Sequence, residues 1–287
     1  MSFERRHDFL VAIDSDGCVF DTVEIKVKEC FIPEIVRCWD LQPLSRFARA
    51  AAEFVILYSK NRGINRFPAL VKIISLLAEW PAARRRMAAL PDLAPLGAWI
   101  ARGTPLSNRD LEAEVARSGD PVLARALDWS AAVNRQVERI VRNVPPFPLV
   151  RECLAELSRW ADLFVCSTTP TEAVEREWRE HGLDAYVRAI QGQEFGPKSR
   201  QIAAAARRGY DRPRILMLGD APGDRAAVQE NGGLFFPIEP GREETSWDRF
   251  HSVAMARFRS GAYSREYESG LVEGFDALLA SEPPWKR

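Results

Sequence analysis

The stretch FLVAIDSDGCVFDT, residues 9–22, constrains the fold of this chain more than any other segment. A short apolar run, residues 9–13, turns abruptly into Asp14-Ser15-Asp16-Gly17. An apolar run of this length that is bounded by turn residues indicates a strand buried on both faces. Such strands are typical of parallel sheets, in which ligand sites gather at the carboxyl ends of the strands. We therefore expect an α/β fold with a site directly after residue 13.

Asp14 and Asp16 lie two residues apart at this predicted strand end. Two neighbouring carboxylates repel one another and are costly to desolvate. A bound cation is the usual way to hold them, and oxygen ligands of this kind suit Mg²⁺. The alternative is a plain turn that closes a strand, because Asp and Gly are common turn residues. The rest of the chain has to decide between the two.

The composition narrows the class of protein. The 287 residues are 46% apolar and 28% charged, which is typical of a globular protein with room for a core domain and an insertion. The formal net charge of zero argues against broad nucleic-acid binding. No apolar signal region opens the chain and no apolar run reaches membrane-spanning length, so we expect a cytoplasmic location.

Histidine and cysteine chemistry is disfavoured. The three histidines are far apart, and the five cysteines form no close pair. A histidine metal site, a Ser-His-Asp triad, a zinc site or a disulfide framework is therefore not expected. The chemistry must come from carboxylates, hydroxyls and amines.

An all-helical domain is expected at residues 22–143. Apolar residues recur there at helical spacing, notably in residues 23–38, 50–58, 70–80 and 122–140, and no strand pattern appears. Pro33 falls inside the first of these patterns, where a helix would kink or restart. The acidic turn and the VPPFP segment at residues 144–148 bound this domain.

Strands and helices alternate in the remainder of the chain. Predicted strands at 162–166, 185–191, 215–218 and 234–236 alternate with predicted helices at 148–160, 171–180, 198–208 and 225–230. This alternation indicates βαβ units and a parallel sheet. Residues 1–21 and 144–245 should form that core. Residues 246–287, whose helical pattern breaks at Ser260-Gly261, should form a helical extension that packs on the core.

Four separated segments place polar residues at predicted strand ends or helix starts. They are Asp14-x-Asp16, Ser167 after the run LFVC, Lys198 at the start of a helix, and Gly219-Asp220-x-x-x-Asp224. Each alone has an ordinary explanation, such as a cap, a turn or a solvated lysine. In a parallel sheet, however, all four would converge on one edge.

These segments resemble the motifs of the haloacid dehalogenase (HAD) superfamily. DSDGCVFD is similar to its first motif, STTP to its second, Lys198 to its third and GDAPGD to its fourth. The helical insertion after the first motif resembles a C1-type cap. The resemblance covers residues 9 to about 240 and implies a Rossmann-like parallel sheet with helices on both faces, plus an inserted all-α cap domain.

The resemblance also implies catalytic roles. Asp14 would be the nucleophile that forms an aspartyl-phosphate. Asp16 would protonate the leaving oxygen and then activate water, and its presence favours phosphate-ester chemistry. Ser167 and Lys198 would bind phosphate oxygens, with Thr168 as the fallback for the hydroxyl.

A Mg²⁺ ion and a substrate follow from the same resemblance. Asp14, the backbone carbonyl of Asp16, and Asp220 would hold the ion, with Asp224 orienting its water or Lys198. Gly17 and Thr168 are further candidates for substrate contact.

In the helical domain, Arg62 and Arg66 belong to a segment, residues 59–67, that combines cations, amides and a glycine. They would bind the part of the substrate beyond the phosphate. The alternative for this segment is a solvated loop between helices.

The expected function is therefore a Mg²⁺-dependent phosphatase that acts on a small phosphorylated metabolite, as a monomer or homodimer, without a nucleic-acid or membrane partner. One alternative is a phosphomutase or phosphotransferase, which would return the phosphoryl group to a hydroxyl. Another is a non-catalytic HAD-like binding module, although no motif residue is lost here.

Overall fold

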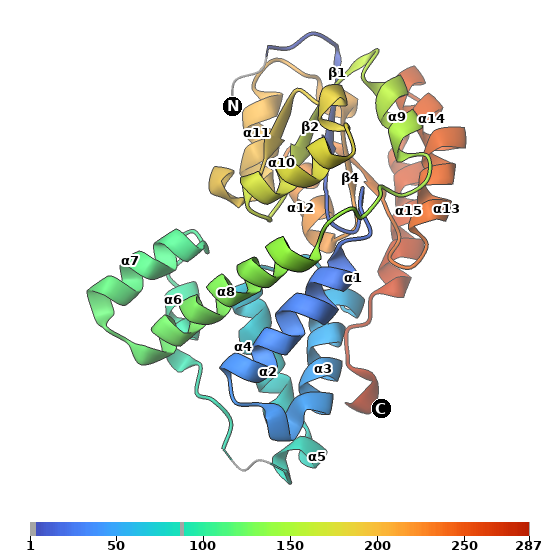
Figure 1. Ribbon diagram of the computed structural model, residues 1–287. Helices are drawn as coiled ribbons and strands as arrows, with labels where there is room; N and C mark the ends of the chain where they lie inside the picture. The colour runs from blue at the N-terminus through green and yellow to red at the C-terminus, as the bar shows by residue number, and fades with distance from the viewer. Residues whose placement is uncertain (1–3, 87–88, 287) are drawn as a thin grey trace. The chain divides into compact units, whose positions relative to one another are not determined.

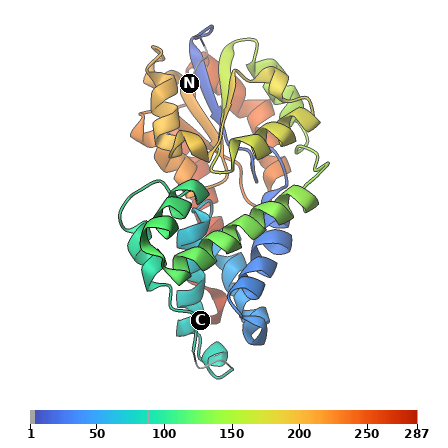
Figure 2. The ribbon, with the colours of Figure 1, turned by 60° about the vertical axis from the view of Figure 1, so that its left-hand side comes forward.

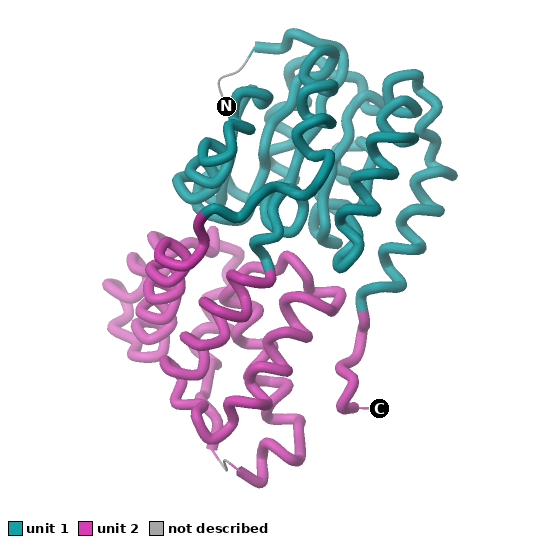
Figure 3. The backbone as a smooth tube through the Cα atoms, turned by 45° about the vertical axis from the view of Figure 1, so that its right-hand side comes forward, with its two compact units in different colours: residues 1–23, 143–279 teal, residues 24–142, 280–287 magenta. Residues whose placement is uncertain are grey.

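The computed structural model describes residues 4–86 and 89–286 (Figure 1). The chain divides into two compact units (Figure 3). The core unit contains residues 1–23 and 143–279, and the helical unit contains residues 24–142 and 280–287. None of the described helices is long and apolar enough to cross a membrane.

In the described part of the chain, the core unit is built on one five-stranded parallel sheet (Figures 1 and 2). Its strands lie in the order β3-β2-β1-β4-β5. Their bounds are Phe9–Ile13 (β1), Ala161–Cys166 (β2), Ala189–Gln191 (β3), Ile215–Gly219 (β4) and Leu234–Pro237 (β5). The chain proceeds outward from β1 to β3 and then returns to β4 beside β1. The switch point, where α/β sheets bind ligands, is thus at the carboxyl ends of β1 and β4.

Helices cover both faces of this sheet, because successive strand residues point to opposite sides. Val11 and Ile13 pack with α9 (Val150–Leu157), α10 (Thr171–Glu180), α13 (Glu243–Arg249) and α14 (Met255–Ser260). Leu10 and Ala12 pack with α11 (Lys198–Ala206), α12 (Pro222–Glu230) and α15 (Arg265–Leu278). The predicted Rossmann-like α/β fold is confirmed.

The helical unit has its own aromatic core. Phe67 and Trp99 pack edge to face with their ring centroids 5.4 Å apart, and the ring centroid of Trp129 lies 6.3 Å from that of Phe67. No β-strand is present among the described residues of 24–142. The helices are α1 (Val23–Ile25), α2 (Ile32–Cys38), α3 (Ser45–Glu53), α4 (Arg66–Glu79), α5 (Pro81–Arg84), α6 (Ala94–Ile100), α7 (Asn108–Ser118) and α8 (Pro121–Ile140), the long green helix of Figure 2.

Local details differ from the sequence pattern for identifiable reasons. The expected restart at Pro33 takes a particular form: a π-helical turn at Lys26–Phe31 ends there, and α2 begins with Pro33 in its first turn. Helix α12 begins at Pro222, before the expected residue 225, because the Asp224 carboxylate accepts the Ala221 N–H at 3.1 Å. The strand expected at 185–191 is limited to β3.

The end of the chain groups with the helical unit, whereas the sequence pattern assigned all of residues 246–287 to packing on the core. The Ala280 N–H donates to the Tyr58 carbonyl, and the Ala280 carbonyl accepts from the Lys60 N–H, both at 3.1 Å. Trp285 stacks on Trp80 with ring centroids 4.0 Å apart. The stack of Trp285 on Trp80 stabilises the position of residues 280–286. Helices α14 and α15 pack on the sheet of the core unit.

Candidate active site

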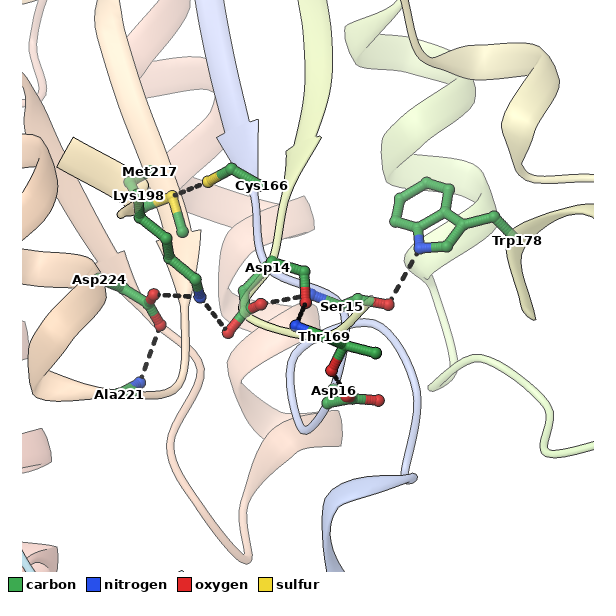
Figure 4. A network of polar contacts seen from close by, with 11 residues as sticks. Asp14, Ser15, Asp16, Cys166, Thr169, Trp178, Lys198, Met217, Ala221 and Asp224 are labelled. Atoms are coloured by element: carbon green, nitrogen blue, oxygen red, sulfur yellow. Dashed lines mark hydrogen bonds and ion pairs between the residues drawn. The ribbon is translucent and has the colours of Figure 1, made fainter. Parts of the chain in front are cut away.

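Asp14 follows the last residue of β1 and lies at the switch point. Its N–H donates to the Leu218 carbonyl at 3.0 Å, which continues the pairing of β1 with β4. The Ser15 N–H donates to Asp14 Oδ1 at 2.8 Å. The other oxygen, Oδ2, contacts Lys198 Nζ at 2.7 Å (Figure 4). The carboxylate is buried and fixed at both oxygens, as a positioned nucleophile requires.

Lys198, the first residue of α11, bridges two carboxylates. Its ammonium lies 2.7 Å from Asp14 Oδ2 and 2.5 Å from Asp224 Oδ1. Burial opposes the ammonium charge, but Asp14 and Asp224 outweigh burial and raise the pKa of Lys198 well above 10.5. Lys198 is therefore a permanent cation in this buried cluster.

Asp14, Asp220 and Asp224 form a cluster of buried carboxylates. One oxygen of each lies within 4.8 Å of the others. A Cβ at position 219 would come within 2.4 Å of Asp224 Oδ2, so Gly219 lets α12 begin this close to β4. Burial raises the pKa of Asp224 from 3.8 to about 6, with Lys198 opposing the rise and Asp14 adding to it.

This cluster fits a divalent cation. Asp14 and Asp224 share the ammonium of Lys198, and Asp220 brings a third carboxylate to the same buried place. All donors are oxygens, the ligands that Mg²⁺ prefers. Asp14, Asp220 and Asp224 are the residues that would hold the ion.

Asp16 lies outside the carboxylate cluster and is held by two hydroxyls. The Thr22 hydroxyl donates to Asp16 Oδ1, and Thr169 Oγ1 donates to Asp16 Oδ2 at 2.8 Å. Gly17, with φ of 75°, makes the tight turn that separates Asp16 from Asp14. Its N–H donates to the Phe20 carbonyl at 2.8 Å. The turn thus gives the two aspartates different surroundings.

The loop after β2 carries the predicted hydroxyl residues. Ser167 is buried, and its N–H donates to the Gln191 carbonyl at 2.8 Å. Ser167 Oγ accepts the Thr169 N–H at 3.1 Å. Thr168 is exposed. The predicted residues thus come from the segments that follow the carboxyl ends of the strands. Asp14, Asp16, Ser167 and Asp220 lie in the loops, Lys198 begins α11, and Asp224 lies in the first turn of α12.

Arg62 and Arg66 lie in the helical unit and hydrogen-bond within it. Arg62 Nη1 donates to the Leu57 carbonyl at 3.0 Å. Arg66 Nη1 donates to Asn134 Oδ1 at 2.6 Å and to Ser130 Oγ at 2.9 Å. Burial lowers the pKa of Arg66 to about 10. The bonds of Arg66 join α4 to α8, and the expected role of Arg62 and Arg66 in substrate binding stays a prediction.

Sequence reasoning missed three side chains that shape the site. Thr22 and Thr169 hold Asp16, and the buried Trp178 Nε1–H donates to Ser15 Oγ at 3.0 Å. Thr22 directly follows the motif DSDGCVFD, and Thr169 is part of the motif STTP. Their hydroxyl groups beside the motif aspartates and Ser167 could therefore have marked them as site residues. Trp178 lies in α10, 163 residues from Ser15 in the chain, and nothing local points to the contact.

A family model for haloacid dehalogenase-like hydrolases matches residues 10–232. No curated protein matches the sequence.

Two solved structures share the fold. One is a predicted phosphoglycolate phosphatase from Haemophilus somnus, with a TM-score of 0.50 and 13% identity, over 79% of this chain and 84% of that chain. The other, from Bacteroides fragilis, is assigned as a haloacid dehalogenase-like hydrolase, with a TM-score of 0.52 and 12% identity, over 84% of this chain and 93% of that chain. At these identities the likeness concerns the fold.

Proposed function

Because this chain belongs to the haloacid dehalogenase-like hydrolase family, we propose that it is a Mg²⁺-dependent phosphatase that hydrolyses phosphate monoesters of small metabolites. The observation that supports this most is the position of Asp14. Its carboxylate lies at the sheet's switch point, 2.7 Å from Lys198 and within 4.8 Å of Asp220 and Asp224. A nucleophile, a fixed cation and a cation-binding group are thus in one place.

In the first step, an Asp14 oxygen forms a bond to phosphorus while the bond from phosphorus to the ester oxygen breaks. Asp16 gives its proton to the departing oxygen, so the leaving group departs as an alcohol. Asp16 suits this role because the Gly17 turn directs it away from the carboxylate cluster and toward Thr22 and Thr169.

In the second step, Asp16 takes a proton from water, and the water oxygen attacks the phosphorus of the aspartyl-phosphate. The bond from Asp14 to phosphorus breaks and the Asp14 carboxylate is restored. Lys198 balances charge on Asp14 and on phosphate oxygens, and the Ser167 hydroxyl donates to one of those oxygens. Bound Mg²⁺ would supply shielding of the phosphate charge from the anionic nucleophile.

A phosphotransferase would use the same residues, with a sugar hydroxyl in place of water. The two alternatives therefore differ only in the acceptor for the phosphoryl group, and product analysis with and without added sugar phosphates separates them. The metabolite itself, the cytoplasmic location and a monomeric or homodimeric state stay predictions from the sequence.

The test is the turnover of p-nitrophenyl phosphate by the full chain, with and without Mg²⁺. We expect Asp14→Asn to lower kcat about 10³-fold or more, since an amide cannot form the acyl phosphate. Asp8→Asn is the matched control, because the exposed Asp8 precedes the other end of the same strand and pairs there with Arg5 and Arg214. Activity that survives in Asp14→Asn, or is lost equally in Asp8→Asn, would reject the assignment.

A further inference from the structure

Thr169, whose contact with Asp16 is drawn in Figure 4, connects the loops that follow three neighbouring strands. Its hydroxyl donates to Asp16 Oδ2 at 2.8 Å, in the loop after β1. Its N–H donates to Ser167 Oγ at 3.1 Å, in the loop after β2. Its carbonyl accepts the N–H of Gln193 at 3.0 Å, in the loop after β3. Side chain, amide and carbonyl are therefore each bound to a different partner.

The backbone around Thr169 has little room to move. A Cβ at position 192 would come within 2.4 Å of the Thr169 carbonyl oxygen and of the Thr171 nitrogen, so Gly192 lets the two loops touch. Gln201 Nε2 donates to the carbonyls of Gly192 and Gly196, at 3.2 and 2.8 Å. Gln201 lies in α11, the helix that begins with Lys198. The loops after β2 and β3 are thus joined to the helix that carries the buried cation.

The direction of each hydrogen bond follows from the donors available. An ionised Asp16 can only accept, so the Thr169 hydroxyl must donate to it. A hydroxyl can also accept, so the contact survives when Asp16 carries a proton. Ser167 Oγ accepts the Thr169 N–H, which leaves the proton of the Ser167 hydroxyl available for a phosphate oxygen. One residue therefore orients both Asp16 and Ser167.

We propose that Thr169 is a positioning residue that fixes the Asp16 carboxyl group for proton transfer to the leaving oxygen. The proposal rests on the proposed phosphatase function. Without the Thr169 hydroxyl, Asp16 Oδ2 loses this hydrogen bond while Thr22 still holds Oδ1, so the carboxyl group is less firmly oriented toward the leaving oxygen. Proton transfer then suffers, while the backbone bonds of residue 169 and the cation at Lys198 are retained.

The dependence on the leaving group tests this role. An alkyl phosphate needs a proton on its departing oxygen, whereas p-nitrophenolate departs without one. We expect Thr169→Val, which keeps the shape of the side chain, to lower kcat/KM for an alkyl phosphate about tenfold or more beyond any effect on p-nitrophenyl phosphate. Thr169→Ser, which keeps the hydroxyl, is the matched control and should restore the wild-type ratio of the two substrates.

The separation of kcat from KM supplies a second readout. In Thr169→Val the loss for the alkyl phosphate should fall on kcat with KM little changed, and Thr169→Ser should recover kcat, a pattern that altered folding alone would not produce. Should Thr169→Val not fold, as judged by its circular dichroism and Tm, Thr169→Ala takes its place in both measurements.

An equal loss on both substrates, or an unchanged ratio in a folded variant, overturns the role of Thr169. These outcomes presuppose a wild-type enzyme whose activity depends on Asp14. If wild type hydrolyses neither ester, or does so without Asp14, the proposed function fails instead, so the two failures are distinguishable.

Discussion

Replacing Lys198 with methionine should destabilise the metal-free protein strongly. Methionine has a similar length and keeps the apolar part of the packing but removes the ammonium between Asp14 and Asp224. Both carboxylates are buried, so neither can recover its interactions with water without unfolding or taking a proton. The variant therefore isolates the contribution of this cation to the site.

The magnitude follows from the two contacts. At 2.7 and 2.5 Å, each charge pair has a gross attraction of about 6 to 7 kcal/mol if the effective dielectric constant is about 20. Much of that offsets desolvation, and removing one partner of a buried pair costs about 3–5 kcal/mol. Since whole domains are stable by about 5–15 kcal/mol, a loss of this size should be plain in an unfolding curve.

Urea unfolding at neutral pH in the presence of a chelator measures this cost for the core unit. The double variant Lys198→Met with Asp224→Asn removes the cation together with one of its carboxylates. It should be more stable than Lys198→Met alone, because less uncompensated charge stays buried. If Lys198→Met costs less than about 1 kcal/mol, or if the double variant is the least stable of the set, the buried charge cluster described here is wrong.

Two further predictions concern the tail and the metal. Trp285→Ala should lower the free energy of unfolding by about 1–2 kcal/mol, because its stacking on Trp80 is lost. Lys286→Ala is the control and should leave the Tm unchanged, because it removes only an exposed ion pair. Equal Tm values for the two variants would contradict the role of the stack. The raised pKa of Asp224 means that its proton stabilises the metal-free fold fully below pH 3.8 and that this contribution is lost as pH rises through about 6. Mg²⁺ must displace that proton, so the Tm gain from MgCl₂ should be larger near pH 7 than near pH 5, and a gain that does not change with pH would argue against Asp224 facing the ion.

The sheet and the motif positions were predictable because their signals are local. β1 and β2 are followed directly by Asp14 and Ser167, and β4 ends in Gly219 before Asp220, so each strand placed a candidate residue at its carboxyl end. β3 gave a weak signal because this edge strand has only three residues and is only partly buried. A short strand of this kind offers no continuous apolar run to recognise.

Contacts between distant segments were not predictable. Thr169 and Asp16 are separated by 153 residues, and only the fold brings the ends of β1 and β2 together. The position of Trp285 was unpredictable for the same reason. Its sequence neighbourhood indicates only an aromatic residue after two prolines, while the partner that determines its position, Trp80, is distant in the chain.

The most direct test of the account is to trap the phosphorylated residue. The enzyme is mixed with an excess of phosphate ester and Mg²⁺, quenched during turnover and treated with borohydride, which reduces an acyl phosphate to an alcohol, and peptides are then analysed by mass spectrometry. We expect homoserine at position 14, and none there in Asp14→Asn. Steady turnover with reduction at another aspartate, or at none, would contradict it.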